Sequence, residues 1–114
     1  MTELKPRVIP LDLNTTGYQR ILGGPPGTVA MRSGLVQLPP GEAVGEHSTH
    51  RKEELIIVLG GEGEFRLNGS GSMEIAHGMT VYCPPDTDHN VVNTGTEVLR
   101  YVYVVSEVGP GPVQ

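Results

Sequence analysis

Glycine and proline interrupt this chain so often that a helical fold is excluded. The sequence holds 16 glycines and 10 prolines among 114 residues, roughly twice their usual combined share of about 12%. No window of a dozen residues is free of both and also carries the apolar repeat of an amphipathic helix. Short strands joined by turns are left, so the chain is predicted to be all-β.

Apolar segments alternate with turn signals from residue 28 onward. Leu55–Leu59 is predicted to be a fully buried strand, because its residues are continuously apolar. Further strands are expected at Thr28–Leu38, Glu64–Leu67, Ser72–Ala76, Thr80–Cys83, His89–Val92 and Val98–Val105. Many short antiparallel strands of this spacing form a sandwich or a barrel.

A single domain accommodates the whole chain at this length. Residues 1–27 are expected to form an N-terminal arm with an edge strand at Arg7–Leu13. Residues 28–108 form the predicted barrel, and residues 109–114, rich in Gly and Pro, are expected to be a flexible tail.

Charge and hydropathy exclude several classes of partner. The formal net charge is −5, and the Arg51-Lys52 pair is the longest basic run, so nucleic acid is not an expected partner. The longest apolar run, Leu55–Leu59, is far shorter than a membrane span, and the N-terminus has no signal-peptide core.

The single cysteine, Cys83, has no internal partner for a disulfide, which is typical of a reducing compartment. A cytoplasmic protein is therefore expected.

Metal-ligand residue types gather just before the run Leu55–Leu59. His47, His50 and Glu54 lie within eight residues of one another. Imidazole nitrogens with a carboxylate oxygen suit Zn, Fe, Mn, Ni or Co. The competing interpretation is a solvated turn, because the segment HSTHRKEE is charged enough to point entirely at water. The residues of this stretch leave both interpretations open.

A further histidine opens a strand later in the chain. The strand Thr80–Cys83 ends at Pro84-Pro85, a tight turn follows, and His89 begins the next strand. A lone histidine in such a place is more often a hydrogen-bonded wall residue than a ligand. Cys83 is predicted to be a small buried side chain, with a redox or ligand role as the alternative.

Taken together, the two stretches resemble the cupin family. Its first motif reads Gly, five residues, His, one residue, His, three or four residues, Glu, six residues, Gly; its second reads Gly, five residues, Pro, one residue, Gly, two residues, His, three residues, Asn. The matching positions are Gly41, His47, Glu54, Gly61, Gly78, Pro84, His89 and Asn93. Asp86 replaces the second motif's third fixed residue, a glycine, which a residue tolerant of positive φ can do. The resemblance implies an antiparallel double-stranded β-helix, or jelly-roll barrel.

The first motif departs from the family pattern at its second histidine. Thr49 stands at the expected position, and His50 follows it. Counted back from Glu54, His50 is in register if a bulge absorbs the extra residue. Counted forward from His47, Thr49 takes the place and His50 points away, since neighbours in an extended chain face opposite sides. We favour His50, because a neutral hydroxyl is a poor ligand. Glu53 is the competing carboxylate to Glu54.

The resemblance also implies one divalent metal ion, Fe, Mn, Ni, Co or Zn, inside the barrel. The expected ligands are His47, His50, Glu54 and His89. Such a set leaves coordination positions open for a substrate or dioxygen. Thr49, Tyr101 and Tyr103 are the expected pocket residues, and the two tyrosines share one face of the last strand because they alternate.

Cupins include dioxygenases, isomerases and decarboxylases, as well as binding proteins that catalyse nothing, so the fold does not give the reaction. We expect a metal-dependent enzyme acting on a small metabolite. The alternative is a non-catalytic cupin that binds or senses a small molecule. A homodimer is also expected, as the family usually shows, because a second copy would cover an exposed sheet edge.

Overall fold

The computed structural model describes residues 4–109. Residues 110–114 of the predicted tail lie outside the described residues. Within them the chain forms nine strands and no helix. The strands are β1 (Gly17–Gly23), β2 (Met31–Leu38), β3 (His47–Ser48), β4 (Lys52–Gly60), β5 (Glu62–Leu67), β6 (Gly71–Ala76), β7 (Thr80–Cys83), β8 (Asp88–Val92) and β9 (Leu99–Glu107). All their ladders are antiparallel. The all-β prediction is confirmed.

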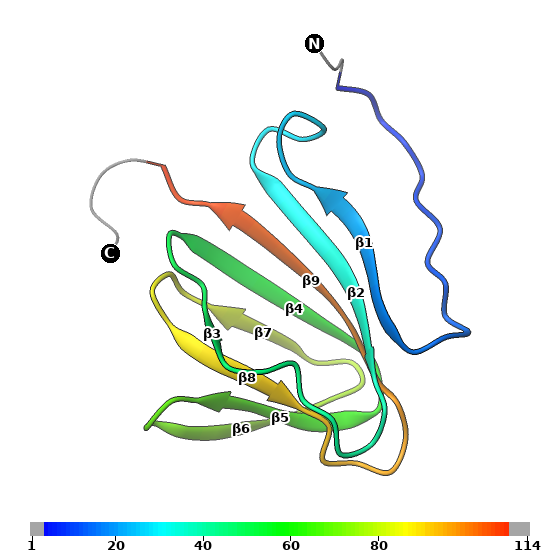
Figure 1. Ribbon diagram of the computed structural model, residues 1–114, viewed down its shortest axis with the longest axis vertical. Helices are drawn as coiled ribbons and strands as arrows, with labels where there is room; N and C mark the ends of the chain where they lie inside the picture. Colours follow the sequence, from blue (N-terminus) through cyan, green and yellow to red (C-terminus); the bar gives the residue numbers. More distant parts are fainter. Residues whose placement is uncertain (1–3, 110–114) are drawn as a thin grey trace.

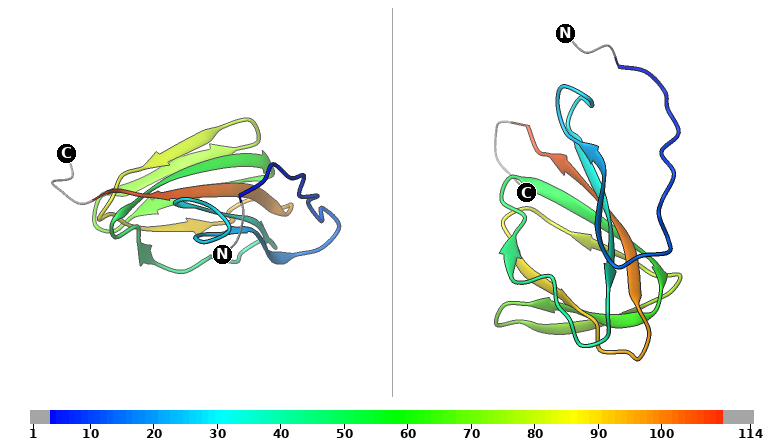
Figure 2. Two further views of the ribbon diagram at one scale, coloured as in Figure 1. Left: turned by 90° about the horizontal axis from the view of Figure 1, so that it is seen from above. Right: turned by 45° about the vertical axis from the view of Figure 1, so that its right-hand side comes forward.

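The strands make two sheets that face each other (Figures 1 and 2). One sheet has five strands in the order β1-β2-β9-β4-β7, and the other has four in the order β3-β8-β5-β6. This is the expected double-sheet barrel. The described part of the chain contains no helix that is long and apolar enough to cross a membrane.

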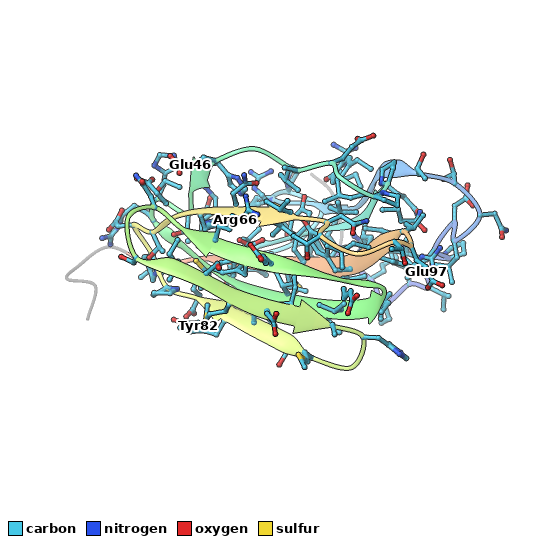
Figure 3. All side chains as sticks on the ribbon, turned by 90° about the horizontal axis from the view of Figure 1, so that it is seen from below. Glu46, Arg66, Tyr82 and Glu97 are labelled. Atoms are coloured by element: carbon cyan, nitrogen blue, oxygen red, sulfur yellow. The ribbon has the colours of Figure 1, made fainter. Side chains whose placement is uncertain are left out.

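The hydrophobic core lies between the two sheets. Its buried members are Leu38, Ile56, Val58, Phe65, Ile75, Val81, Cys83, Val91, Leu99 and Tyr101. Each fully buried Ile, Val, Leu or Phe side chain contributes about 1.5–3 kcal/mol relative to exposure. Figure 3 shows Glu46 and Glu97 at opposite ends of the barrel. His47 directly follows Glu46 in the chain, so the first histidine lies at the Glu46 end of the barrel. The core residue Leu99 lies two positions after Glu97, at the other end.

The prediction that Leu55–Leu59 is buried on both faces is wrong. The side chains of β4 alternate: Glu54, Ile56 and Val58 are buried, whereas Leu55 is 41% exposed. The run is continuously apolar because one face of the strand meets the core and the other carries apolar residues on the outside of the sheet. The consequence for the site is that Glu54 shares the inward face with Ile56.

The edge strand expected at Arg7–Leu13 does not form; the edge of the sheet is β1, at Gly17–Gly23. Pro10 has no N–H to give to a ladder. The arm is fixed by side chains instead, since the Gln19 amide donates to the Pro10 carbonyl at 3.0 Å and the Gln37 amide donates to the Asp12 carbonyl at 2.9 Å. The arm runs beside β1 in Figure 1.

Two motif positions have the backbone conformation that their residue types predict. Gly61 has φ +79°, and a Cβ there would lie 2.4 Å from the Val98 carbonyl oxygen, so a side chain is excluded by both strain and space. Asp86 has φ 54°, which aspartate tolerates better than most residues. The replacement of a family glycine by Asp86 therefore preserves the turn.

Candidate metal centre

Two histidines meet because β3 pairs with β8. His47 and His89 are direct partners in this short antiparallel ladder, and directly opposed side chains share one face of a sheet. Their ring centroids are 4.2 Å apart. The His89 ring also stacks on Phe65, with centroids 5.2 Å apart and planes inclined by 17°. The core residue Phe65 therefore holds His89 in one orientation.

The carboxylate of the group comes from the opposite sheet. Glu54 on β4 is 8% exposed and lies level with Cys83 on β7 and Val105 on β9. Its neighbour Glu53 points outward and accepts a hydrogen bond from the Tyr82 hydroxyl at 2.9 Å. Strand alternation thus puts Glu54, and not Glu53, beside the histidines. Ligand atoms of His47, Glu54 and His89 all lie within 4.8 Å of one another.

Backbone carbonyls fix which nitrogen each histidine presents. Nδ1 of His47 is 2.8 Å from the Gly45 carbonyl oxygen, and Nδ1 of His89 is 3.0 Å from that of Thr87. A carbonyl oxygen only accepts, so both Nδ1 atoms must carry the proton. Both Nε2 atoms therefore have a free lone pair, as a metal-binding histidine held by its other nitrogen does.

The buried end of the group suits a proton or a cation between His89 and Glu54. Nε2 of His89 lies 3.1 Å from Glu54 Oε1, yet among the described residues it has no hydrogen bond of acceptable geometry. A lone pair facing a carboxylate oxygen in a buried place is unfavourable unless a proton or a metal ion stands with them. The donor set and this unpaired nitrogen both fit a divalent transition metal.

The electrostatics of His89 favour a positive charge at this place. Burial acts to lower its pKa, but the Glu54 carboxylate, the Thr87 carbonyl and the charge of Asp88 outweigh burial, and the pKa of His89 is raised. Surroundings that favour a positive charge on the ring also favour a cation bound beside it.

Thr49 ties together the two loops that adjoin the strands of the histidines, β3 and β8. Its hydroxyl donates to the Pro84 carbonyl at 2.7 Å and accepts from the Thr87 N–H at 3.1 Å. A backbone hydrogen bond from the Thr49 N–H to the Thr87 carbonyl, at 3.2 Å, adds to this link. Both roles of the hydroxyl are thus used within the protein, and Thr49 acts as a clamp between the loops.

The structure does not bring His50 into the group. His50 has φ 52° in the turn between β3 and β4 and is exposed. Its carbonyl accepts from the Asp86 N–H at 2.7 Å, and its N–H donates to the Ser48 hydroxyl. The extra residue of the motif is absorbed by this left-handed turn residue. His50 is one of the residues that line the cavity described next.

A cavity of about 320 Å³ opens above the three residues. The expected pocket residues Thr49, Tyr101 and Tyr103 all line it, together with the three grouped residues. The remaining lining residues are Tyr18, Val36, Val44, Ser48, His50, Lys52, Val91 and Val105.

Three polar residues of this lining were not expected from the sequence: Ser48, Lys52 and Tyr18. Lys52 lies two positions before Glu54 on β4 and so shares its inward face; strand parity alone would have found it. Tyr18 lies on β1, and its hydroxyl is 2.8 Å from that of Tyr103. No signal identified Tyr18, because β1 itself was not recognised as a strand.

Cys83 is buried, as predicted. Burial, together with the charge of Glu54, raises the pKa of its thiol to about 11, so the thiol is protonated at neutral pH. Its sulfur lies 3.8 Å from Nδ1 of His89, the ring nitrogen that does not face Glu54. Cys83 therefore packs directly beside His89.

Comparisons with known proteins identify the family of the chain. The sequence model described as "Cupin domain" matches residues 34–105. A Streptomyces cyaneus protein named polyketide synthase CurC is 31% identical, over 98% of this chain and 77% of that protein. An oxalate-binding protein of Thermotoga maritima is 33% identical over 61% of this chain, a match that spans 57% of that protein.

Solved structures agree with the sequence matches. A cupin 2 conserved barrel domain protein from Salinispora arenicola superposes with a TM-score of 0.74 at 25% identity, over 91% of each chain. A predicted oxalate decarboxylase from Thermotoga maritima has a TM-score of 0.65 at 22% identity, over 88% of this chain and all of the other, and shows the fold alone. Motif spacing, double-sheet barrel and family match lead to one conclusion: the chain belongs to the cupin family.

Proposed function

We propose that the protein is a metal-dependent enzyme acting on a small metabolite, with one divalent ion held by His47, Glu54 and His89. The observation that carries the proposal is the buried Nε2 of His89, which faces Glu54 without a hydrogen bond at the floor of an open cavity. A structural site would close around its ion, whereas a site that opens to a cavity leaves room for a ligand.

Each residue has a distinct task in this proposal. Glu54 brings the negative charge, and the two imidazoles are oriented by the carbonyls of Gly45 and Thr87. When bound, Fe, Mn, Ni, Co or Zn supplies Lewis acidity or redox chemistry to a ligand in the cavity. The valines and tyrosines of the lining exclude water around that ligand.

The named relatives support a small metabolite as the ligand. One carries a name from polyketide synthesis and another is named for oxalate binding. Dioxygenase, isomerase and decarboxylase chemistry all remain within the proposal, because each uses a metal with open coordination positions.

The second candidate is a cupin that binds a small molecule without transforming it. The observation that favours it is the position of His50, which leaves three grouped donors where four were expected from the sequence. Turnover of a ligand that the metal-loaded protein binds would exclude this candidate.

We also propose that the protein is a homodimer. Leu55 on β4 and Tyr82 on β7 are direct partners on the outer face of the five-stranded sheet, and they are 41% and 59% exposed. A second copy would remove this apolar surface from water.

The metal proposal is tested by counting metal ions per chain. The protein is purified without chelator, supplemented with Fe and Mn under anaerobic conditions, and analysed by plasma mass spectrometry. About one ion per chain is expected, falling to near zero when His47→Ala and His89→Ala are combined. His77→Ala is the control, since His77 is exposed and lies outside the group. A native protein with near-zero metal would contradict the proposal.

The same measurement resolves the role of His50. His50→Asn removes the imidazole but retains a residue type that tolerates positive φ. We expect full occupancy in this variant. Loss of metal equal to that in His47→Ala would instead make His50 a ligand through movement of its turn.

A further inference from the structure

The inward face of β9 carries two tyrosines next to the metal group. Val105 is level with Glu54, Tyr103 with Ile56 and Tyr101 with Val58. At about 3.4 Å per residue, these positions follow one another along the strand in steps of about 7 Å. A ligand that reaches the metal group and extends into the cavity would therefore pass along these tyrosines.

The hydroxyl of Tyr101 is available to a ligand. Tyr101 is 3% exposed and lines the cavity, yet its hydroxyl makes none of the hydrogen bonds found among the described residues. His89 Nε2 is the one buried and unpartnered side-chain N or O atom of the described residues, so the Tyr101 hydroxyl is accessible from the cavity. Burial, with the charges of Glu54 and Tyr103, raises the pKa of Tyr101, so at neutral pH the hydroxyl is a donor without an acceptor.

Two further hydroxyls stand at the cavity wall as a pair. The hydroxyls of Tyr18 and Tyr103 are 2.8 Å apart, and their rings are stacked with centroids 6.3 Å apart. Gly34 makes room for them, because a Cβ there would lie 2.5 Å from Cε1 of Tyr18 and 2.7 Å from Cε2 of Tyr103. Since one hydroxyl donates to the other, one proton of the pair is left for a ligand.

The rest of the lining is poorly suited to a small dianion. The valines Val36, Val44, Val91 and Val105 form much of the wall, and Lys52 is the one Lys or Arg of the lining. The cavity of about 320 Å³ has room for roughly ten water-sized groups at about 30 Å³ each. A two-carbon dicarboxylate bound at the group would leave much of this volume unfilled.

We propose, building on the metal-dependent function above, that the ligand is a hydroxylated aromatic compound of fused rings. One oxygen substituent faces His47, Glu54 and His89. A second accepts hydrogen bonds from Tyr101 and from the Tyr18–Tyr103 pair, and the flat apolar rings lie against the valines. Tyr101 is thus a specificity-determining residue, and Tyr18 is a wall residue supplied by a strand that lies outside the matched cupin segment.

The test compares three probes by calorimetric titration of the Zn²⁺-loaded protein. Zinc is chosen because it has no redox chemistry that would consume the probes. The probes are 2,6-naphthalenediol, which has a hydroxyl at each end, 2-naphthol, which has one, and oxalate. We expect the diol to bind at least about tenfold more tightly than oxalate. Tyr101→Phe should weaken diol binding by about fivefold, the effect of one hydrogen bond, and leave 2-naphthol unchanged.

Tyr18→Phe is a second variant, at an exposed position, for the case in which Tyr101→Phe does not fold. It leaves the Tyr103 proton but removes the hydroxyl that holds it in place, and it should also weaken diol binding more than 2-naphthol binding. Oxalate binding as tightly as the diol would overturn the ligand class, and so would equal affinities of native protein and a folded Tyr101→Phe variant for the diol.

The two proposals fail in distinguishable ways. Full Zn²⁺ occupancy with a preference for oxalate would overturn the aromatic ligand and leave the metal-dependent function standing. No Zn²⁺ binding, with a metal-free protein that still prefers the diol and loses that preference in Tyr101→Phe, would overturn the metal-dependent function and leave the aromatic ligand standing.

Discussion

At the scale of single residues, the site depends on how each polar atom is satisfied. Thr49 and His89 illustrate the difference. The Thr49 hydroxyl is fully used between Pro84 and Thr87, whereas Nε2 of His89 is buried without a hydrogen bond. A satisfied buried group stabilises the fold, and an unsatisfied one costs free energy until a ligand or ion meets it. This contrast separates the clamp from the candidate metal ligand.

A substitution at Thr49 tests the clamp. Thr49→Val keeps the shape of the side chain but leaves the Thr87 N–H without its acceptor. The free energy of unfolding, measured by urea denaturation, should fall by about 1–3 kcal/mol, with metal occupancy unchanged. Thr80→Val, at an exposed strand position, should change stability by less than about 0.5 kcal/mol. Unchanged stability with lost metal in Thr49→Val would make the hydroxyl a ligand instead.

Motif spacing predicted His47, Glu54 and His89 because it records which residues share an inward face. The spacing did not determine whether His50 joins the group, because that depends on the backbone φ angle of His50. With φ 52°, His50 absorbs the extra residue and its side chain stays outside the group. Histidine and Thr49 are both compatible with an extended chain, so nothing in the residue types of this segment selects the left-handed turn. A glycine there would have signalled it.

At the scale of elements, the cavity wall depends on the pairing of β1 with β2. This pairing brings Tyr18 opposite Val36, and β9 on the other side of β2 brings Tyr103 opposite Gly34. The Tyr18–Tyr103 contact therefore spans β2 and crosses over Gly34. A residue with any side chain at position 34 would separate the two rings.

Gly34→Ala tests this arrangement. The added methyl group would overlap both rings, and Tyr18 is the side chain that can swing outward, because it is exposed. We expect the protein to fold, with the Tyr18–Tyr103 hydrogen bond lost and diol affinity reduced about as much as in Tyr18→Phe. Gly27→Ala is the control, since a Cβ there meets only ordinary contacts. Native tyrosine ring signals in the NMR spectrum of Gly34→Ala would contradict the account.

The strands that the sequence predicted well are the ones with a clear apolar pattern. The bounds of β7 were predicted correctly, and β2, β5, β6 and β8 differ by one to three residues at one end. The two strands that were missed have little apolar pattern: β3 has only two residues, His47 and Ser48, and β1 holds GYQRILG with a mostly exposed face. Their pairing comes from contacts with β8 and β2 that are distant in sequence.

At the scale of the whole molecule, the barrel leaves apolar residues on the outside of its larger sheet. Leu55, Leu59 and Tyr82 are exposed on β4 and β7. Apolar contact surface of this kind is typical of a protein interface. The proposed homodimer follows from this surface and would leave the cavity on the opposite, inward face of the sheet open.

Light scattering after size exclusion tests the dimer. The native protein should have twice the 12.2 kDa mass of the chain. Leu55→Glu should give the monomer mass, because it places a charge in the centre of the proposed interface. Met73→Glu changes an exposed apolar residue of the other sheet and should remain dimeric. A native protein of monomer mass at micromolar concentration would rule out this interface.

We have proposed that the two sheets together hold one metal ion between His47, Glu54 and His89. The most direct measurement is a crystal structure of the Zn²⁺-supplemented protein with anomalous diffraction data. We expect one strong anomalous peak at about 2.0–2.2 Å from Nε2 of both histidines and from a Glu54 oxygen. A fully occupied peak coordinated by His50 in place of one of these residues, or no peak at the group, would contradict it.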